Sequence, residues 1–400
     1  MKKIIALVWG ICSMVAVGAQ PYASHCIIIE EIFPDPSPSV GLPEFEFIEL
    51  LNRSDSTIDL KNWSVGDLTS RTQIPFSVLL APDSVLILCS QSAAQVYSRL
   101  GKTVGLQGFP SLNKQSDHLV LYAPDGRVIH ALQYDQSWYH NAVKSSGGWS
   151  LEMINPLHPC VGIDNWEASN DASGGTPGRL NSPHAFFQDQ AGPRLVRAYL
   201  QDSVTLLLEF DEPLDSIAAI TRARYTCYPQ LELQMISPSP PFFKVLIITL
   251  SKAADPEKIY QLRISDLVDC SGNRFDENEM IRVGLPAPPE PGSLVINEVL
   301  FNPPPDGYDY LELYNRGKSP VNLEQLRLAN RSLSSWNNIV SPIEKPTLLF
   351  PGEYAVLTEN KSWLLPKYRL TPAAAVFEVK KLPALPDDKG VIAILNYDGR

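Results

Sequence analysis

A segment near the start of the chain recurs near its end. Residues 46–67 read EFIELLNRSDSTIDLKNWSVGD, and residues 309–330 read DYLELYNRGKSPVNLEQLRLAN, without a gap. A second block repeats as well, because residues 109–127 (FPSLNKQSDHLVLYAPDGR) match residues 382–400 (LPALPDDKGVIAILNYDGR). A repeat of this length predicts two copies of one fold in a single chain. It constrains the architecture strongly and the activity hardly at all.

Two identical matches inside the repeat serve as markers. Glu49 falls on Glu312, and Asn52 falls on Asn315. Since the hydrophobic pattern and the turns set strand register, we expect these pairs to occupy equivalent places on strands of the same order and direction.

The composition favours short strands over helices. The chain has 35 prolines, where average usage gives about 20 in 400 residues. Hydrophobic residues make up 44% and charged residues 19% of the chain, as in a folded protein rather than a disordered one. Apolar runs separated by Pro, Gly, Asn and Asp are typical of sandwiches and barrels. The runs expected to form strands are residues 27–29, 46–51, 84–88, 118–122, 204–210, 244–250 and 259–264, and the one expected helix spans residues 93–100.

The net charge limits the classes of partner. A formal charge of −11 argues against a nucleic-acid interface, which requires a clustered positive field. An anionic membrane surface is disfavoured for the same reason. A protein or a glycan is the class of partner that we expect.

The N-terminus has the pattern of an export signal. Lys2 and Lys3 precede an apolar run over residues 4–17, and small residues up to Ala19 predict cleavage before Gln20. The run is shorter than the ~20 residues that a membrane span requires. We therefore expect a signal peptide at residues 1–19 and an exported chain with no membrane span after its removal.

The expected fold class is all-β, with three consecutive β-sandwich (immunoglobulin-like) domains. The first spans residues 26–182, and the second, which has the size of one immunoglobulin domain, spans residues 192–285. A proline-rich linker at residues 286–292 leads to the second copy at residues 293–400. The second copy stops where the first copy still continues. We therefore expect the last domain to be incomplete and the protein to extend past residue 400.

Short motifs accompany the repeat. The paired segments are IIEEIFPDP (28–36) with VINEVLFNP (295–303), and EFIELLN with DYLELYN; the first copy adds IDLKNW (58–63), LAPDSVLIL (80–88), SLEMINP (150–156) and TPGRLN (176–181). Together they resemble the lamin tail domain family, although the second copy has Leu326 where the first has Trp63. The segments LLLEFDEPLD (206–215) and YQLRISDLVDCSGN (260–273) resemble a bacterial immunoglobulin-like domain. The resemblance implies β-sandwich modules of exported or surface proteins, and it implies no catalytic residues.

Acidic residues recur in both copies. The candidate cation ligands are Glu31, Glu49, Glu298 and Glu312. Acids from neighbouring strands can bind Ca²⁺ or act as an acid/base pair. On a strand, however, Glu49 shares a face with Phe47 and Leu51, and a buried carboxylate needs a partner. We favour a structural role, in which Glu49 accepts hydrogen bonds from turn amides or from Arg53.

Other motifs give weaker signals. The spacing of Asp266, Asp269, Ser271 and Asn273 does not match a calcium loop, and we interpret it as a β-turn. The histidines show no metal-binding spacing. Several aromatic residues can form either a sugar-stacking face or, more commonly, part of a core; they are Trp63, Trp138, Tyr139, Trp149 and Trp166.

The cysteines are odd in number once the signal is removed. The remaining residues are Cys26, Cys89, Cys160, Cys227 and Cys270. Export permits disulfides, and an odd count leaves at least one thiol unpaired. We expect a disulfide between Cys227 and Cys270 in the middle domain, with two buried free thiols as the alternative. Cys89 and Cys160 are a further candidate pair, which leaves Cys26 as the odd thiol.

Three functions follow from this pattern. The first is a non-enzymatic exported surface protein whose modules act as spacers or adhesive units, without a cofactor. The second is a set of accessory modules of a secreted hydrolase, such as a nuclease or phosphatase, with its catalytic domain beyond residue 400. The third is a carbohydrate-binding module.

Overall fold

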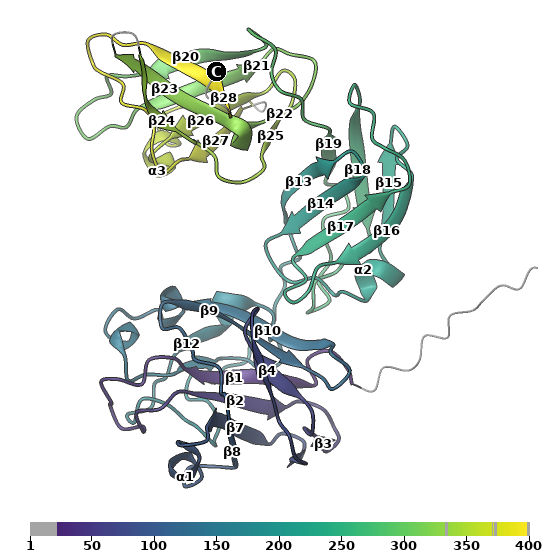
Figure 1. Cartoon of the computed structure of the whole chain (residues 1–400), viewed down its shortest axis with the longest axis vertical. Helices are drawn as coiled ribbons and strands as arrows, with labels where there is room; N and C mark the ends of the chain where they lie inside the picture. The colour runs from purple at the N-terminus through teal and green to yellow at the C-terminus, as the bar shows by residue number, and fades with distance from the viewer. Residues whose placement is uncertain (1–21, 333–334, 370, 372–373, 398–400) are drawn as a thin grey trace, which may run out of the picture. The chain divides into compact units, whose positions relative to one another are not determined.

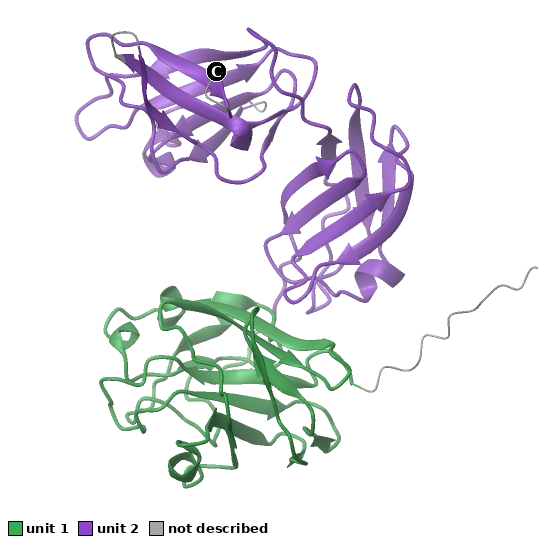
Figure 2. Ribbon diagram, in the orientation of Figure 1, with its two compact units in different colours: residues 1–188 green, residues 189–400 purple. Residues whose placement is uncertain are grey.

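The computed structural model describes residues 22–332, 335–369, 371 and 374–397. The expected signal peptide at residues 1–19 lies outside these residues. The chain divides into two compact units, residues 1–188 and 189–400 (Figure 2). Strands dominate both units (Figure 1), which confirms the all-β fold class. Among the described residues, no helix is both long and apolar enough to span a membrane.

The first unit is a sandwich of two sheets. Its larger sheet has the order β12-β11-β1-β2-β7-β8, its smaller sheet has the order β10-β9-β4-β5, and β3 pairs with β6. The strands are β1 (Ile27–Phe33), β2 (Phe47–Asn52), β3 (Ile58–Asp59), β4 (Ser64–Gly66), β5 (Arg71–Gln73), β6 (Leu79–Leu80), β7 (Val85–Ser90), β8 (Thr103–Leu106), β9 (Ser116–Tyr122), β10 (Val128–Asp135), β11 (Leu151–Met153) and β12 (Trp166–Ala168). Short helical turns are α1 (Ala94–Tyr97), η1 (Gln136–Tyr139), η2 (Lys144–Ser146) and η3 (Gly162–Asn165).

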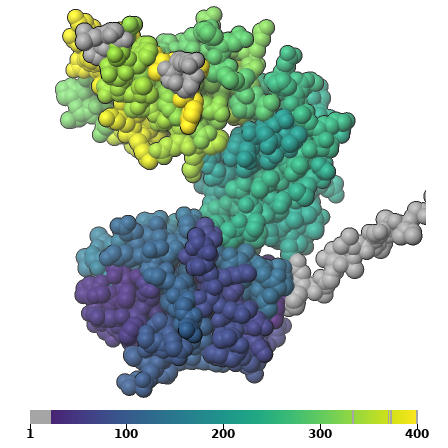
Figure 3. All heavy atoms as spheres, viewed as in Figure 1, coloured from purple at the N-terminus to yellow at the C-terminus, as the bar shows by residue number. Residues whose placement is uncertain are grey.

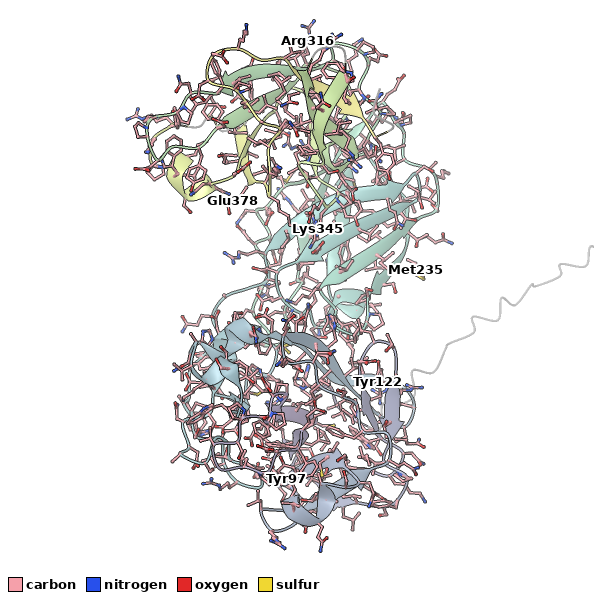
Figure 4. All side chains as sticks on the ribbon, turned by 60° about the vertical axis from the view of Figure 1, so that its left-hand side comes forward. Tyr97, Tyr122, Met235, Arg316, Lys345 and Glu378 are labelled. Atoms are coloured by element: carbon pink, nitrogen blue, oxygen red, sulfur yellow. The ribbon has the colours of Figure 1, made fainter. Side chains whose placement is uncertain are left out.

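The larger sheet is buried on both faces at its centre. Every residue of β1 is buried, because one face packs on the core between the sheets and the other on a second apolar cluster. Tyr97, which ends α1, closes this cluster by packing its ring on Phe47 and donating its hydroxyl to the carbonyl oxygen of Phe45 (Figure 4). The loop between β1 and β2 is mostly exposed, and it lies at the surface in purple in Figure 3.

The middle segment is a smaller sandwich with its own core. Its sheets have the orders β13-β14-β17-β16 and β15-β18-β19. In β14 and β17 buried residues alternate with partly buried ones, as expected for strands with one face on a core. The elements are β13 (Leu195–Asp202), β14 (Thr205–Phe210), α2 (Ala218–Thr221), β15 (Arg224–Tyr228), β16 (Leu233–Pro238), β17 (Val245–Leu250), β18 (Ile259–Ser265) and β19 (Ile281–Gly284).

The last segment repeats the topology of the first unit around a third core. Its sheets have the orders β20-β21-β26-β27 and β24-β23-β28, and β22 pairs with β25. The elements are β20 (Leu294–Leu300), β21 (Tyr310–Asn315), β22 (Val321–Asn322), η4 (Leu323–Gln325), β23 (Leu326–Ser332), β24 (Ser335–Val340), β25 (Leu348–Leu349), β26 (Tyr354–Thr358), α3 (Lys361–Leu364), β27 (Ala374–Glu378) and β28 (Ile392–Asn396).

The two copies share strand register as well as order. Glu31 pairs with Glu49 across β1 and β2, and Glu298 pairs with Glu312 across β20 and β21. Both pairs of strands carry a β-bulge directly before this position. The parallel pairing of β7 with β8 recurs as the parallel pairing of β26 with β27. The predicted repeat is therefore confirmed.

One asparagine fixes the same corner in each copy. The side-chain amide of Asn52 donates to the carbonyl oxygens of Ser56 (2.9 Å) and Leu80 (2.8 Å). The amide of Asn315 donates to those of Ser319 (3.0 Å) and Leu349 (2.8 Å). Both asparagines are fully buried. The turn after β2 or β21 is thus tied to the short strand β6 or β25 by hydrogen bonds that no apolar residue can replace.

Both predicted disulfides are wrong. Cys89 and Cys227 are free thiols, as is Cys26, whereas Cys160 and Cys270 are disulfide-bonded. The reason is packing: Cys89 is buried in the apolar cluster beside β1, and Cys227 packs against the core of the middle segment. Burial raises the pKa of both thiols to about 11.

We expect Asn315→Ala to destabilise the second copy by about 1–3 kcal/mol, because two buried carbonyl oxygens lose their donor. Hydrogen exchange of the full chain, read over residues 293–397, measures this loss without assuming two-state unfolding. Asn337→Ala is the matched control, since that asparagine is exposed and its side-chain amide donates to the nearby carbonyl of Ser335. Equal effects of the two substitutions would contradict the structural role of the corner.

Candidate functional site

Three adjacent strands bring four glutamates together in the first unit. Glu30 and Glu31 lie on β1, Glu49 on β2 and Glu152 on β11. Glu31 stands opposite Glu49 on one side and Glu152 on the other. Glu31, Glu49 and Glu152 are 0% exposed, and Glu30 is 4% exposed. We call these four residues the carboxylate cluster.

A loop from the end of the unit donates hydrogen bonds to the cluster. This closing loop comprises residues 174–182. The backbone amide of Thr176 donates to Oε1 of Glu31 (2.9 Å), and that of Gly178 donates to Oε2 of Glu49 (2.5 Å). A carboxyl group can accept such hydrogen bonds whether it is protonated or ionised. The cluster therefore anchors the loop to the middle of the sheet.

The same loop also holds the third strand. The hydroxyl of Thr176 donates to Oε1 of Glu152 (2.9 Å), and the backbone amide of Ser182 donates to Oε2 (2.6 Å). The side-chain amide of Asn181 donates to the backbone carbonyl of Glu30 (3.0 Å). The TPGRLN motif is thus a set of donors directed at the strands beneath it.

The path of the loop requires glycine at one position. Gly178 has φ +85°, and a Cβ there would lie 2.5 Å from the carbonyl oxygen of Leu100. Only glycine adopts this backbone region freely and leaves room for such a close approach. The backbone conformation at Gly178 therefore sets the position of the amide that binds Glu49.

Two oxygens of the cluster have no hydrogen-bond partner among the residues that the structure describes. They are Oε2 of Glu31 and Oε1 of Glu49. The other oxygen of Glu31 also accepts from the hydroxyl of Ser150 at 2.6 Å. An unpartnered charged oxygen in a dry interior is costly, which favours the protonated form of these side chains.

Burial raises the pKa of Glu30, Glu31 and Glu49. The pKa values of Glu31 and Glu49 lie well above the usual range. Burial is the larger cause, and repulsion from the neighbouring carboxylates adds to it. Burial and the charge of Glu152 raise the pKa of Glu30 to about 8. Neighbouring carboxylates raise one another's pKa in this way when they cannot all ionise. Glu30, Glu31 and Glu49 therefore keep their protons to a higher pH than an exposed glutamate does.

The second copy places its acids differently. Glu298 is exposed and Glu312 is partly buried. Tyr310 donates its hydroxyl to Glu298, and Asn297 donates its side-chain amide to Glu312 (2.7 Å). Among residues 293–397 as far as described, no segment corresponds to the closing loop. Within the described residues, the counterparts Glu298 and Glu312 are therefore less buried than Glu31 and Glu49.

The structural interpretation of Glu49 agrees with these contacts, since a loop amide binds it. Arg53, the other donor expected for Glu49, instead donates its guanidinium hydrogen bonds to the carbonyl oxygens of His25 and Leu157. Glu30 and Glu152 are the members that the sequence analysis did not single out. Glu152 does lie within the SLEMINP motif. That strand is too short, however, for its pattern of apolar and polar residues to show which face of the sheet Glu152 occupies.

Another group of acids lies in the second unit. Ligand atoms of Asp189, Glu212 and Asp269 lie within 4.8 Å of one another, close enough for a metal ion. Burial, followed by the charges of Asp269, Asp189 and Asp211, raises the pKa of Glu212 to about 7. Asp269 also accepts the backbone amide of Asn273 (2.8 Å), as expected of the predicted β-turn. The sequence missed this group because its members come from three distant segments.

The aromatic residues do not form a sugar-stacking face. Trp63, Trp138, Tyr139 and Trp166 are at most 7% exposed and belong to the core of the first unit. Trp149 is partly buried, and the ammonium of Lys144 lies over its ring at 4.7 Å. The carbohydrate-binding hypothesis loses the residues on which it rested.

We expect Glu49→Gln to weaken the pH dependence of the first unit's stability. Glu31 and Glu49 keep protons in the folded state at a pH where the unfolded chain has released them. The free energy of unfolding therefore falls as pH rises above about 4.5, by up to about 1.4 kcal/mol per pH unit for each group. Glutamine cannot ionise, so the variant should match the wild type near pH 4.5 and exceed its stability at pH 8.

Urea unfolding of the full chain at pH 4.5, 6 and 8, with exchange read over residues 22–182, measures this difference. Glu44→Gln is the control, because Glu44 is exposed. The role of burial would be refuted if the wild type and Glu49→Gln lost stability equally between pH 4.5 and pH 8.

Comparison with solved structures finds bacterial surface-layer proteins at low similarity. The N-terminal part of the bacterial S-layer protein SbsC matches with 15% sequence identity and a TM-score of 0.22. The match covers 38% of this chain and 37% of the SbsC chain. The S-layer protein rSbsC(31-844) matches with 12% sequence identity and the same TM-score. This match covers 42% of this chain and 32% of the rSbsC chain. The matched part spans about a third of those chains, and TM-scores this low carry no argument. No curated protein matches the chain.

The comparison with protein families is decisive for the two copies. The model of the Lamin Tail Domain matches residues 20–136 and residues 287–396. These ranges contain the repeated strands, the shared bulge and the asparagine corner described above. Together they cover more than half of the chain. The chain belongs to the lamin tail domain family, of which it carries two copies.

Proposed function

We propose that this chain is an exported structural protein of the cell surface, in which the lamin-tail and immunoglobulin-like modules act as spacers or adhesive units. The observation that carries this proposal is the burial of the carboxylate cluster. The residues with the most unusual acid chemistry in the first module hold the module together instead of facing a substrate.

The geometry of the cluster supports this role. A catalytic acid or base must come within hydrogen-bonding distance of a substrate atom. Glu31 and Glu49 are 0% exposed and lie beneath the closing loop, which binds both. A substrate could reach these residues only if the loop's hydrogen bonds broke and the sheet became exposed. The cluster therefore fits a structural role better than an active site.

The loops of the first module supply surface for a protein partner. Val143 is 80% exposed and Leu157 is 59% exposed, and both lie between strands. Binding residues commonly lie on loops that a rigid scaffold holds in place. A protein partner at these loops is the form of adhesion that we propose.

Carbodiimide coupling of the native full chain at about pH 5.5 tests the buried role. We expect Glu44 to be modified in the native protein, whereas Glu31 and Glu49 react only after denaturation. Peptide mapping by mass spectrometry gives the modified positions. Native labelling of Glu31 and Glu49 at the rate of Glu44 would show an accessible site and overturn the proposal.

Export is tested separately at the N-terminus. We expect the mature protein to begin at Gln20 and to be digested by protease added to intact cells. Ala19→Arg provides the control, since a large residue at the cleavage position should leave residues 1–19 attached. N-terminal sequencing that finds Met1 on surface-exposed wild-type protein would contradict the predicted signal peptide.

A further inference from the structure

One sheet of the middle segment is basic in an otherwise acidic chain. Its strands β15, β18 and β19 contain three arginines, Arg224, Arg263 and Arg282, and no acidic residue. The chain as a whole has a formal charge of −11. The acids of the middle segment therefore lie on its other strands and its loops, and this sheet has the opposite sign of charge.

The strands direct two of these arginines to the same outer face. In β15 and β18, exposed residues alternate with residues that pack on the core, and Arg224 and Arg263 are exposed (Figure 1). Arg224 stands opposite Ser265, and Arg263 stands opposite Thr226. The two arginines are thus diagonal neighbours, at a spacing of about 7–8 Å. We call the outward side chains of this sheet the basic face: Arg224, Thr226, Tyr228, Gln261, Arg263, Ser265 and Arg282.

Two arginines of the basic face have no acidic partner. Among the described residues, no carboxylate forms an ion pair with Arg224 or Arg263, whereas Arg282 pairs with Glu353. Arg263 donates to the sulfur of Met280 at 3.7 Å, and a thioether is a weak acceptor. A guanidinium presents a fork of donors that matches a carboxylate. Arg224 and Arg263 can therefore each bind an external anion.

A pocket continues the basic face at one end of the sandwich. It has a volume of about 470 Å³ and lies where the connection from α2 to β15 meets the loop after β18. Arg222 and Arg224 line it, together with Arg274, which pairs with Asp266 (3.1 Å) and Glu277 (3.4 Å). A volume of this size is in the range of pockets that hold small ligands. The pocket thus adds Arg222 to the arginines that no acid neutralises.

The groups between the arginines fit a sugar better than a peptide. Thr226, Gln261 and Ser265 offer hydroxyl and amide groups, which pair with the hydroxyl groups of a sugar. Tyr228 is 77% exposed, and its ring is the one aromatic surface of the basic face. A bound peptide gains specificity from pockets for its side chains, and the basic face presents no aliphatic side chain to line them. A nucleic acid needs a stronger positive field than this chain supplies.

We propose that the basic face and the pocket at its end bind an acidic polysaccharide, a chain of sugars that carry carboxylate groups. Arg224 and Arg263 bind carboxylates by charge-assisted hydrogen bonds. The ring of Tyr228 stacks on a sugar, and the pocket receives a further sugar acid at Arg222. This inference goes beyond the protein partner proposed for the first module, and it rests neither on export nor on the carboxylate cluster.

Titration of the purified full chain with polygalacturonate tests this inference. The buffer contains EDTA, which removes cations that could bridge the polymer to the chain's own acids. We expect saturable binding by calorimetry and slower hydrogen exchange over β15 and β18, and no binding of neutral dextran. Poly-glutamate carries carboxylates without sugar rings and should bind at least about tenfold more weakly. Raising the salt from about 50 mM to about 500 mM should weaken binding, because salt screens exposed charges.

Substitutions on the basic face separate its charges from its ring. Arg224→Ala and Arg263→Ala should each weaken binding about tenfold, since each removes a hydrogen bond to a charged group. Tyr228→Leu should weaken binding of polygalacturonate and leave that of poly-glutamate unchanged. The matched control is Arg99→Ala, because Arg99 is an exposed arginine of the first unit and its loss changes the net charge equally. All four side chains are exposed, so thermal unfolding of the variants should match that of the wild type.

Several results would overturn the proposal. They are the absence of saturable binding to polygalacturonate, wild-type affinity in both Arg224→Ala and Arg263→Ala, and protection away from β15 and β18. Equal affinity for poly-glutamate would reduce the contact to charge alone. Tighter binding of single-stranded DNA than of polygalacturonate would assign the basic face to a nucleic acid. Either outcome would also refute a polysaccharide site.

Discussion

The hydrogen bonds between the carboxylate cluster and the closing loop are the interaction on which the first module depends. Thr176 and Gly178 bring backbone amides to Glu31 and Glu49, which lie at the centre of the larger sheet. Burying carboxyl groups there costs free energy, which protonation and the loop's donors reduce. In return the last segment of the module is fastened to its first strands. The module's stability and the burial of its carboxylate cluster thus have the same cause.

Residues 293–397 show which features of the fold recur in the second copy. Register, bulge, parallel strand pair and asparagine corner are all present. These features lie within strands that pair with each other, so they do not need the closing loop. What changes is the environment of β20, whose acids are accessible and whose apolar residues are partly uncovered. Within the described residues, the strand's order and register are thus shared by the two copies, whereas the burial of its side chains is not.

Much of the architecture was predictable from the sequence, because it rests on local patterns that occur twice. The gapless match predicted that Glu49 and Glu312, and Asn52 and Asn315, would share positions, and register confirms it. The site was only half predictable. Glu31 and Glu49 could be named, but their partners come from residues 150–182, and no local pattern indicates which distant strand lies alongside. The disulfide prediction failed for a related reason: Cys89 and Cys227 have the apolar surroundings of core residues, which spacing along the chain does not reveal.

The closing loop also has a consequence for the order of folding. The contact between Glu31 and Thr176 spans 145 residues, and that between Glu49 and Gly178 spans 129. Contacts this distant in sequence must overcome a large loop-closure entropy before they contribute, and they slow folding. Synthesis proceeds from the N-terminus, so β1 and β2 exist as chain long before the residues that complete their surroundings. The first module cannot close until nearly all of it has been made, and its isoleucine-rich first strand requires protection from aggregation in the interval.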